Sequence, residues 1–167
     1  MAVINDYVNS NTISTANKLE AAALSVGAEV IAMCQTFEIA AGDDNGSVYR
    51  LFKSLNPDLI PLKIEIRCDA ITGGTDFDLG FYTPLENGGA VIDADILMDG
   101  QTLASALTTS PADGLGIVDI ANRCKRIYEH CGHTQATKKL GYDLALTANT
   151  VGTAAGTVTV IAYFAQG

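Results

Sequence analysis

The chain has 167 residues, the size of one ordinary domain, and this length is enough to bury roughly two thirds of the surface that the unfolded chain would expose. Charged residues make up only 17%, against the roughly 25% usual in soluble domains, so the polar surface depends on Thr, Ser, Asn and Gly, as is typical of a β-rich protein or of one partly covered by neighbours. The formal charge of −9 repels phosphate backbones and argues against nucleic acid as a partner.

Residues 1–31 are predicted to form an N-terminal arm, which precedes a β-sandwich domain at residues 32–167. The arm starts MAVINDYVNSN, which lacks the basic start and apolar core of a secretory signal, and the chain has no apolar run of about 18 residues that would span a membrane. It has few charges and sustains neither helix nor strand periodicity, although Ala16–Leu24 would suit a short helix. We expect a neighbouring subunit or an underlying surface to order it, because alone it buries too little apolar surface to offset about 1–2 kcal/mol of backbone entropy per residue. Packing as a helix on its own sandwich is the alternative.

Two short strands are predicted next, on either side of a turn. Met33, Phe37 and Ile39 share one phase of a strand over residues 33–39. The sequence GDDNG at residues 42–46 predicts the turn, and Ser47–Lys53 predicts the second strand. The turn is not a calcium loop, because a serine stands where the closing glutamate of such a loop belongs.

The stretch Leu62–Tyr82 shows the clearest alternation and predicts a β-hairpin. In its first half, apolar residues alternate with charged ones: Leu62, Ile64, Ile66, Cys68 and Ala70 are expected to be buried, and Lys63, Glu65, Arg67 and Asp69 to face water. Thr72–Thr75 contains two glycines and is expected to form the turn. Phe77, Leu79 and Phe81 then mark the buried face of the return strand.

The stretch AVIDADILMDGQTLASAL at residues 90–107 has mixed periodicity and predicts a strand or irregular segment, followed by a helical turn near Leu103–Leu107. Its aspartates do not fit a calcium loop, because Leu97 and Ala104 stand at ligand positions.

One accessory helix is predicted over residues 117–131, ending at Gly132, because apolar residues recur there at steps of three and four. This stripe consists of Ile117, Ile120, Ala121, Cys124, Ile127, Tyr128 and Cys131. The helix is expected to lie over an open end or edge of the sandwich.

The last two predicted strands, Leu140–Ala148 and Thr157–Ala165, flank a Gly- and Thr-rich connection and are expected to form a long hairpin. In the second of them, Ile161 and Tyr163 fall on the face that should be wet. A strand that is apolar on both sides is covered on both sides, so either the predicted helix or a neighbouring subunit is expected to cover this face.

No catalytic, cofactor-binding or metal-binding residue is predicted. The chain has no Gly-x-Ser-x-Gly motif and no P-loop, and the segment Glu129–His133 offers zinc-ligand residue types without a CxxC pair or a second cluster. The four cysteines are expected to be small buried thiols without disulfides. The cations of residues 123–139 are interpreted as a solvated face, because no aromatic residues interleave with them.

Several segments together resemble a family of tailed-phage virion structural proteins. They are Gly46–Leu51, Cys68–Tyr82, Gly88–Asp95, Gly141–Thr147 and Ala155–Val160, and the likeness extends over about residues 33–165. The family is similar to capsid decoration or cement proteins. The resemblance therefore implies an all-β, jelly-roll-like β-sandwich, to which the patterns described above add one accessory helix and an N-terminal arm. Its motifs are structural, so it transfers no functional residue.

The resemblance implies a non-enzymatic decoration protein that is made in the host cytoplasm and binds the outside of a phage head. The implied partners are the major capsid protein and further copies of this chain, most simply as a homotrimer, with no cofactor, nucleic acid or membrane. A tail or neck component is an alternative. A carbohydrate-binding β-sandwich is another, for which only Tyr7, Tyr49, Tyr82 and Tyr163 are candidate platform residues.

Overall fold

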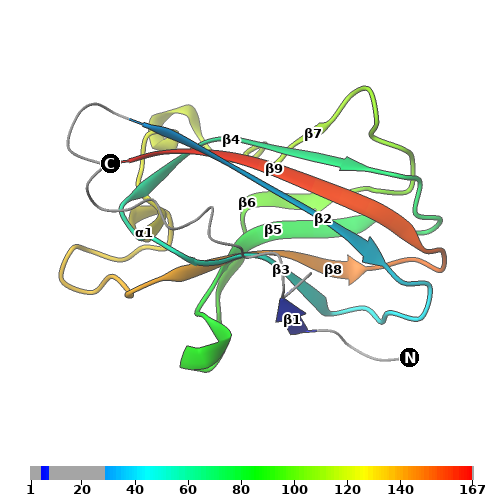
Figure 1. Cartoon of the computed structure of the whole chain (residues 1–167), viewed down its shortest axis with the longest axis horizontal. Helices are drawn as coiled ribbons and strands as arrows, with labels where there is room; N and C mark the ends of the chain where they lie inside the picture. The colour runs from blue at the N-terminus through cyan, green and yellow to red at the C-terminus, as the bar shows by residue number, and fades with distance from the viewer. Residues whose placement is uncertain (1–4, 8–28, 167) are drawn as a thin grey trace.

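The computed structural model describes residues 5–7 and 29–166, and the side chains of residues 29–166. The described chain folds into two facing β-sheets with short helical turns at one end (Figure 1). Its strands are β1 (Asn5–Tyr7), β2 (Val30–Ile39), β3 (Ser47–Leu55), β4 (Leu59–Cys68), β5 (Asp76–Tyr82), β6 (Val91–Gln101), β7 (Ala112–Asp113), β8 (Tyr142–Thr150) and β9 (Gly156–Gln166).

The strand order identifies the sandwich as a jelly roll. One sheet has the order β1-β3-β8-β5-β6 and the other the order β2-β9-β4-β7. From β2 to β9 the chain changes sheet at every connection except β5 to β6, which gives the eight-stranded double-sheet arrangement of jelly rolls. The predicted all-β, jelly-roll-like sandwich is therefore confirmed. β1 is an addition to this plan and pairs in parallel with the edge strand β3.

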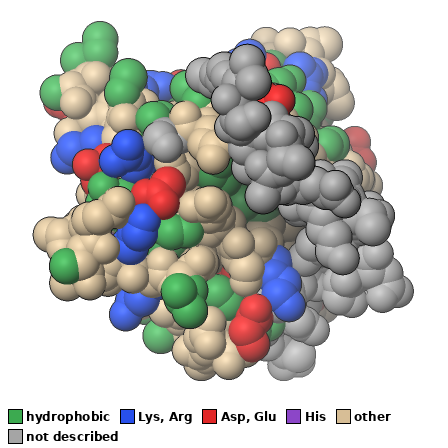
Figure 2. Space-filling model, turned by 60° about the vertical axis from the view of Figure 1, so that its left-hand side comes forward, with side chains coloured by type: hydrophobic (Ala, Val, Ile, Leu, Met, Phe, Trp, Pro, Cys, Tyr) green, Lys and Arg blue, Asp and Glu red, His purple; other side chains and the backbone are tan. Residues whose placement is uncertain are grey.

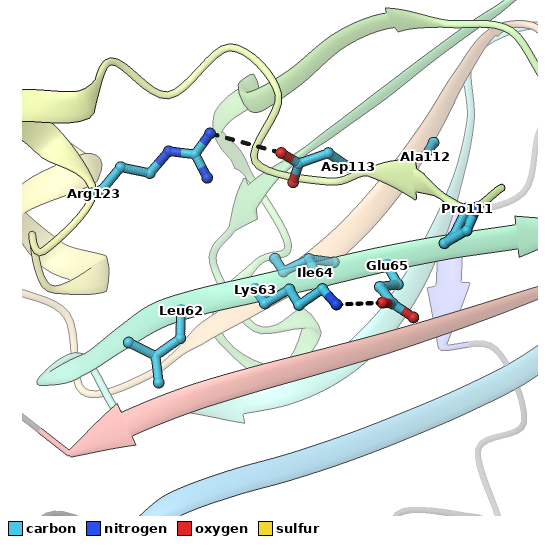
Figure 3. Close-up of a pocket in the computed structure, with 8 residues that line it drawn as sticks. All are labelled: Leu62, Lys63, Ile64, Glu65, Pro111, Ala112, Asp113 and Arg123. Atoms are coloured by element: carbon cyan, nitrogen blue, oxygen red, sulfur yellow. Dashed lines mark ion pairs between the residues drawn. The ribbon is translucent and has the colours of Figure 1, made fainter.

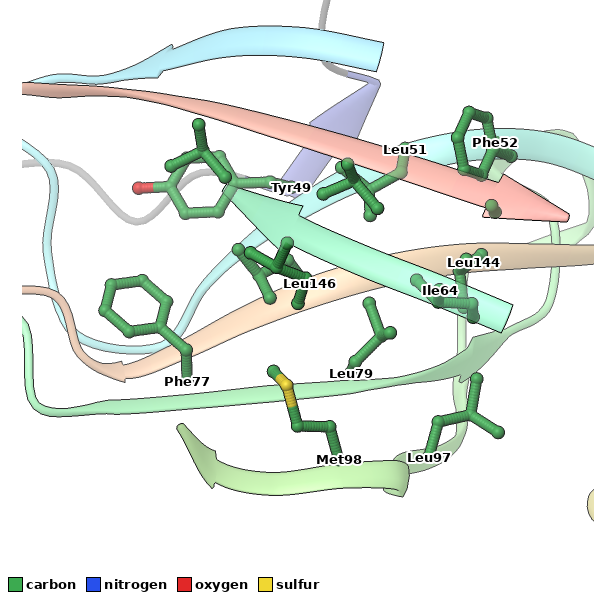
Figure 4. Packing of buried hydrophobic residues seen from close by; sticks show 14 of the residues in the cluster. Tyr49, Leu51, Phe52, Ile64, Phe77, Leu79, Leu97, Met98, Leu144 and Leu146 are labelled. Carbon is green, nitrogen blue, oxygen red and sulfur yellow. The ribbon is translucent and has the colours of Figure 1, made fainter. Parts of the chain in front are cut away.

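A single hydrophobic core fills the space between the sheets, because each strand alternates between inward and outward residues. On β9, Val158, Val160, Ala162 and Phe164 all point inward and are fully buried. Across the core, Leu79, Leu144 and Leu146 point toward Ile64 of β4 (Figure 4). The inward phases predicted for Phe77, Leu79 and Phe81 are confirmed.

The hairpin predicted over Leu62–Tyr82 is wrong. β4 and β5 are strands, but they belong to opposite sheets, and residues 69–75 cross from one sheet to the other. Gly73 has the positive φ of +78° expected of a turn, yet this turn places Ile71 inside the sandwich, where it is fully buried. The crossing thus seals the core at one end, which a hairpin turn in a single sheet would leave open.

The second predicted hairpin is wrong for the same reason, since β8 and β9 also lie in different sheets. Their connection packs directly against the first crossing: Thr153 N–H donates to Thr72 O at 2.9 Å. Gly152 has a φ of +92°, and a Cβ there would lie 2.5 Å from Thr72 O, so only glycine allows the two crossings to approach so closely.

Two local details also differ from the alternation of the sequence. Leu62 is 44% exposed, because a bulge between Pro61 and Lys63 shifts the register of β4 against β9 and turns Leu62 out of the core. Residues 91–101 form the strand that the sequence allowed, but Leu103–Leu107 is not helical. Leu103 instead extends into the core and exchanges backbone hydrogen bonds with Ile71 and Gly74.

The helix predicted over 117–131 is present only as two separate turns, a 3-10 turn at Ile120–Asn122 and the short helix α1 at Ile127–His130. The chain is extended between them, with ψ 160° at Arg126. Ile120 is 90% exposed, so only the second half of the predicted apolar stripe is buried.

Ile127 and Tyr128 belong to the core, and α1 covers an open end of the sandwich, as predicted (Figure 1). We call this the α1 end; β2 begins there and β9 ends there. A further 3-10 turn, Leu85–Asn87, lies in the connection between β5 and β6.

Of the predicted arm, Asn5–Tyr7 form β1, and the remainder up to residue 28 lies outside the described residues.

Gly80 on β5 generates a prediction about the β5–β6 pairing. Between the pairs Leu79–Met98 and Phe81–Asp93 the backbone of β6 bulges over Gly80, and a Cβ at Gly80 would lie 2.5 Å from Ala94 C. We expect Gly80→Ala to lower the free energy of unfolding by about 1–3 kcal/mol or more, because backbone must move to admit the methyl group. Urea unfolding measures this change. Gly42→Ala is the control, since no atom lies within 4 Å of its added Cβ; equal effects of the two substitutions would contradict the explanation.

Candidate functional site

The outer face of the sheet containing β3, β8, β5 and β6 is buried at its centre, on β3, β8 and β5. Val48, Tyr82 and Ala145 form a small cluster on this face, and Ala94 from the bulge of β6 packs against them. The Tyr82 hydroxyl and the Thr147 hydroxyl lie 2.7 Å apart, and burial raises the pKa of Tyr82. This face is therefore an outer layer of packing that the β6 bulge helps to cover.

A fully buried ion pair between Arg50 of β3 and Asp143 of β8 lies on the same face. Arg50 Nη1 lies 2.9 Å from Asp143 Oδ2 and also donates to Thr83 O at 2.9 Å. Its Nη2 donates to Gly89 O at 2.6 Å, and the guanidinium lies over the Tyr82 ring at 5.0 Å from the centroid. Arg50 thus fastens both ends of the β5–β6 connection to the sheet.

Asp143 uses its second oxygen to hold a strained residue. Asp143 Oδ1 accepts a hydrogen bond from Ser54 N–H at 2.8 Å, and Ser54 has a φ of +48°, a left-handed conformation that costs energy for a residue other than glycine. The Asp143 carboxylate therefore stabilises both the guanidinium and the irregular end of β3. The sequence does not indicate this pair, because its members are 93 positions apart and no local pattern connects them.

The outer face of the sheet containing β2, β9 and β4 is only partly buried and divides into two halves. Toward the α1 end, Tyr163 and Ile161 of β9 lie beside Ala32 and Cys34 of β2. Toward the other end, Thr159 bonds Thr36, and Thr157 donates to Glu38, both at 2.8 Å. Thr157, Thr159, Ile161 and Tyr163 therefore share one outer face, as predicted.

α1 does not cover this face, because its apolar residues Ile127 and Tyr128 pack into the core between the sheets. The helix is therefore excluded as the cover for Ile161 and Tyr163, which was one of the two alternatives expected from the sequence.

A pocket of about 300 Å³ lies at the β4 edge of the same sheet, between β4 and β7, with Arg123 from the following connection at its rim (Figure 3). Its charged groups form two ion pairs, Lys63 with Glu65 at 2.5 Å and Arg123 with Asp113 at 3.7 Å. The Lys63 ammonium lowers the pKa of Glu65. Because the charged side chains that line the pocket are already paired with one another, none of them is available to bind a charged ligand.

The zinc-like segment Glu129–His133 does not converge on a common point. Glu129 accepts a hydrogen bond from Arg126 N–H at 2.8 Å, and His133 Nδ1 lies 2.6 Å from the Tyr142 hydroxyl. Burial lowers the pKa of His130. Within residues 29–166, no three His, Cys, Asp or Glu side chains are placed to hold a metal ion together. The same residues contain no helix with the length and apolar character needed to cross a bilayer.

The cysteines are free thiols in different settings. Cys68 is buried and Cys131 partly buried, and burial raises the pKa of Cys131 to about 12. The expectation of burial is wrong for Cys34, which points outward from β2, and for Cys124, which lies on the unburied half of the predicted helical stripe.

The predicted cation cluster is spread over a mixed surface, and two of its five members form ion pairs. Lys138 bonds Asp58 at 2.6 Å and lies over the Tyr128 ring, and Arg123 pairs with Asp113. The space-filling view shows basic and acidic side chains interspersed with apolar ones on the side of the molecule that faces the viewer (Figure 2). This arrangement agrees with the interpretation as a solvated face.

Of the tyrosines considered for sugar binding, Tyr49 and Tyr82 are buried. Tyr49 packs in the core and donates to Asp43 at 2.7 Å. Tyr163 is partly exposed, and the side chain of Tyr7 lies outside the described residues. The described side chains thus offer one candidate, Tyr163, where a sugar-binding platform needs several aromatic rings.

Neither protein-family models nor curated protein sequences give a match to this chain. Among solved structures, a chain in the capsid of Ralstonia phage GP4 is similar, with a TM-score of 0.56 and 13% identity over 83% of this chain and 85% of that one. A chain in the capsid asymmetric unit of cyanophage Pam1 has a TM-score of 0.48 and 15% identity over 84% of this chain and 87% of that one. At such low identity the GP4 likeness establishes a common fold, and the lower Pam1 score adds no argument.

The Arg50–Asp143 pair generates a second prediction. We expect Arg50→Met and Asp143→Leu to lower the free energy of unfolding by about 3–5 kcal/mol each, because each leaves a buried charge without its partner. The double variant should lose less than the sum, since it leaves no charge unpaired. A double-mutant cycle by urea unfolding measures the coupling, with Lys63→Met of the exposed pair as a nearly neutral control. Strictly additive losses would show that the two residues act independently.

Proposed function

We propose that this chain is a structural protein of a phage virion, and specifically a decoration or cement protein that binds the outside of the head and stabilises it. The observation that carries this proposal is the jelly roll itself, which is shared over 83% of the chain with a chain in the capsid of Ralstonia phage GP4. Jelly rolls serve in viral capsids and also in lectins, so the fold alone does not decide between these roles.

The side-chain chemistry supports a structural role over an enzymatic or sugar-binding one. The buried charges of Arg50 and Asp143 are satisfied by contacts within the chain, and the charged side chains of the pocket beside β4 are paired with one another. Tyr49 and Tyr82 are unavailable to a sugar because they are buried. A tail or neck component has the same support as a head protein, and the experiment below separates them.

The proposed partners are the major capsid protein and further copies of this chain, as a homotrimer on the capsid surface after synthesis in the host cytoplasm. The apolar half of the β2-β9-β4 outer face supports self-association, because Ile161 and Tyr163 are not covered by α1. The formal charge of −9 supports a protein partner over nucleic acid.

A reconstitution experiment tests this proposal. The purified full-length chain is added to phage heads assembled without it, and cryo-electron microscopy and thermal rupture of the heads are measured. A decoration protein should occupy regular positions on the outer shell and raise the rupture temperature. Binding to purified tails alone would favour the tail or neck alternative, and binding to neither would contradict a virion role.

Residues 1–31 are proposed to act as an arm that helps to attach the protein to a neighbour or to the shell. We expect deletion of residues 2–25 to leave the melting temperature nearly unchanged, because β1 is a three-residue addition at the edge of its sheet and the strands β2 to β9 lie in residues 30–166. Attachment to the heads should weaken, as measured by co-sedimentation. A truncated protein that fails to fold, or that binds as tightly as the full chain, would contradict this role.

A further inference from the structure

All six large hydrophobic side chains that are exposed among the described residues belong to connections of the α1 end or to the half of a strand that is nearest to it. They are Val30, Leu62, Val91, Ile117, Ile120 and Leu140. The strand register places Val30 at the start of β2, opposite the last residues of β9. Val91 pairs with Tyr82, which pairs with Asp143 at the start of β8. Ile120 and Leu140 belong to the connection between β7 and β8 that contains α1, and they are 90% and 98% exposed.

The opposite end has no such side chains. It is formed by the connections 40–46, 69–75, 102–111 and 151–155. The large apolar residues of these connections point inward: Ile71, Leu103 and Val151 are buried, and Leu107 is packed against the core. The two ends therefore differ in how much apolar surface they expose, although the core is sealed at both.

The charges are distributed with the same asymmetry. The connections of the opposite end carry three aspartates, Asp43, Asp44 and Asp69, and no Lys or Arg. The connections of the α1 end (56–58, 83–90 and 114–141) carry five Lys and Arg residues against four acidic ones. Of these cations, Lys125, Arg126 and Lys139 form no ion pair with any described residue, and Arg126 donates a hydrogen bond to the Tyr128 hydroxyl. Lys139 is next in sequence to Leu140, the most exposed of the apolar residues.

We propose that the α1 end is the face by which this protein docks on another protein, whose contact surface is apolar and carries carboxylates. An exposed apolar group beside unpaired ammonium groups complements such a surface, since burial of the apolar side chains supplies affinity and the opposite charges supply orientation. The inference rests on the proposed function, and the partner is then the outer shell of the phage head.

Two other occupants fit the α1 end less well. Nucleic acid is disfavoured because the chain as a whole is strongly acidic and the acidic residues at this end nearly equal its cations in number. A second copy docking its acidic opposite end here would make a head-to-tail contact, and repetition of such a contact that does not close on itself builds an open filament. A shell with exposed carboxylates avoids both difficulties.

Matched substitutions at the two ends test the assignment. Ile120→Asn with Leu140→Asn removes apolar contacts at the α1 end, and Ala155→Asn introduces the same side chain at an exposed position of the opposite end. All three positions are on the surface, so both variants should melt as the wild type does. We expect the α1-end variant to bind the heads at least about tenfold more weakly, corresponding to about 1.4 kcal/mol, and the opposite-end variant to bind normally. Wild-type binding should also weaken in high salt, because Lys125 and Lys139 contribute through charge.

Two native thiols provide an independent readout. Cys124 lies in the connection at the α1 end and Cys34 on the outer face of β2, and both are exposed. Free protein and protein on heads are labelled with maleimide and compared by mass spectrometry: Cys124 should lose reactivity on the heads, whereas Cys34, on the face proposed to join copies, reports contacts between copies. Normal binding by the α1-end variant, or Cys124 that stays reactive on the heads, overturns the assignment but leaves the decoration role intact. A change in oligomeric state of the α1-end variant also overturns it, since the end would then join copies of the chain. Failure of the wild type to bind heads overturns the proposed function itself.

Discussion

The closure of the sandwich depends on three crossings between the sheets that meet around one buried side chain, Ile71. Ile71 N–H donates to Leu103 O, Leu103 N–H donates to Gly74 O, and Thr153 N–H donates to Thr72 O, each at 2.9 Å. The connections β4–β5, β6–β7 and β8–β9 are therefore joined through their backbones. Because buried backbone groups must be paired, this network lets the chain pass from sheet to sheet without leaving unsatisfied donors beneath the surface. It also holds the two sheets in the alignment that the core requires.

Because of this network, the connections at the crossing end are tightly constrained in conformation, whereas those at the α1 end are less so. At the crossing end the connections are short, and Gly152 approaches Gly74 and Thr72 so closely that a side chain would not fit. At the α1 end the core is sealed by α1, and the β5–β6 connection is fastened by Arg50. The long β7–β8 connection at this end contributes three residues to the core, Leu115, Ile127 and Tyr128, and much of the rest of it is exposed. Loops supported in this way by a rigid scaffold are where proteins commonly place their contacts with partners.

The sequence was informative about strands and uninformative about which sheet each strand joins. Period-2 alternation correctly assigned the inward residues of β5 and β9, because burial of one face is a local property. A connection of five to seven residues containing glycine suits a hairpin as well as a crossing, and only contacts such as that of Gly152 with Thr72 distinguish them. The stripe predicted over 117–131 has helical spacing, but only its second half meets the core. The Arg50–Asp143 pair joins strands that are far apart in sequence, and no local sequence pattern indicates that these two residues are in contact.

The negative charge of the chain restricts how copies can approach one another on a particle. At a formal charge of −9, neighbouring copies repel at any acidic contact, so close approach favours a surface with few unpaired charges. The apolar half of the β2-β9-β4 outer face meets this condition, because its nearest charges, Lys63 and Glu65, neutralise each other. The α1 end differs from the rest of the chain in this respect. Its unpaired lysines are suited to contact with an acidic surface. If both surfaces are used, copies would contact one another through a sheet face while their α1 ends point together toward the shell, and the polar crossing ends would remain outermost. Lateral and basal contacts would then depend on separate sets of residues, so that a substitution in one set need not weaken the other.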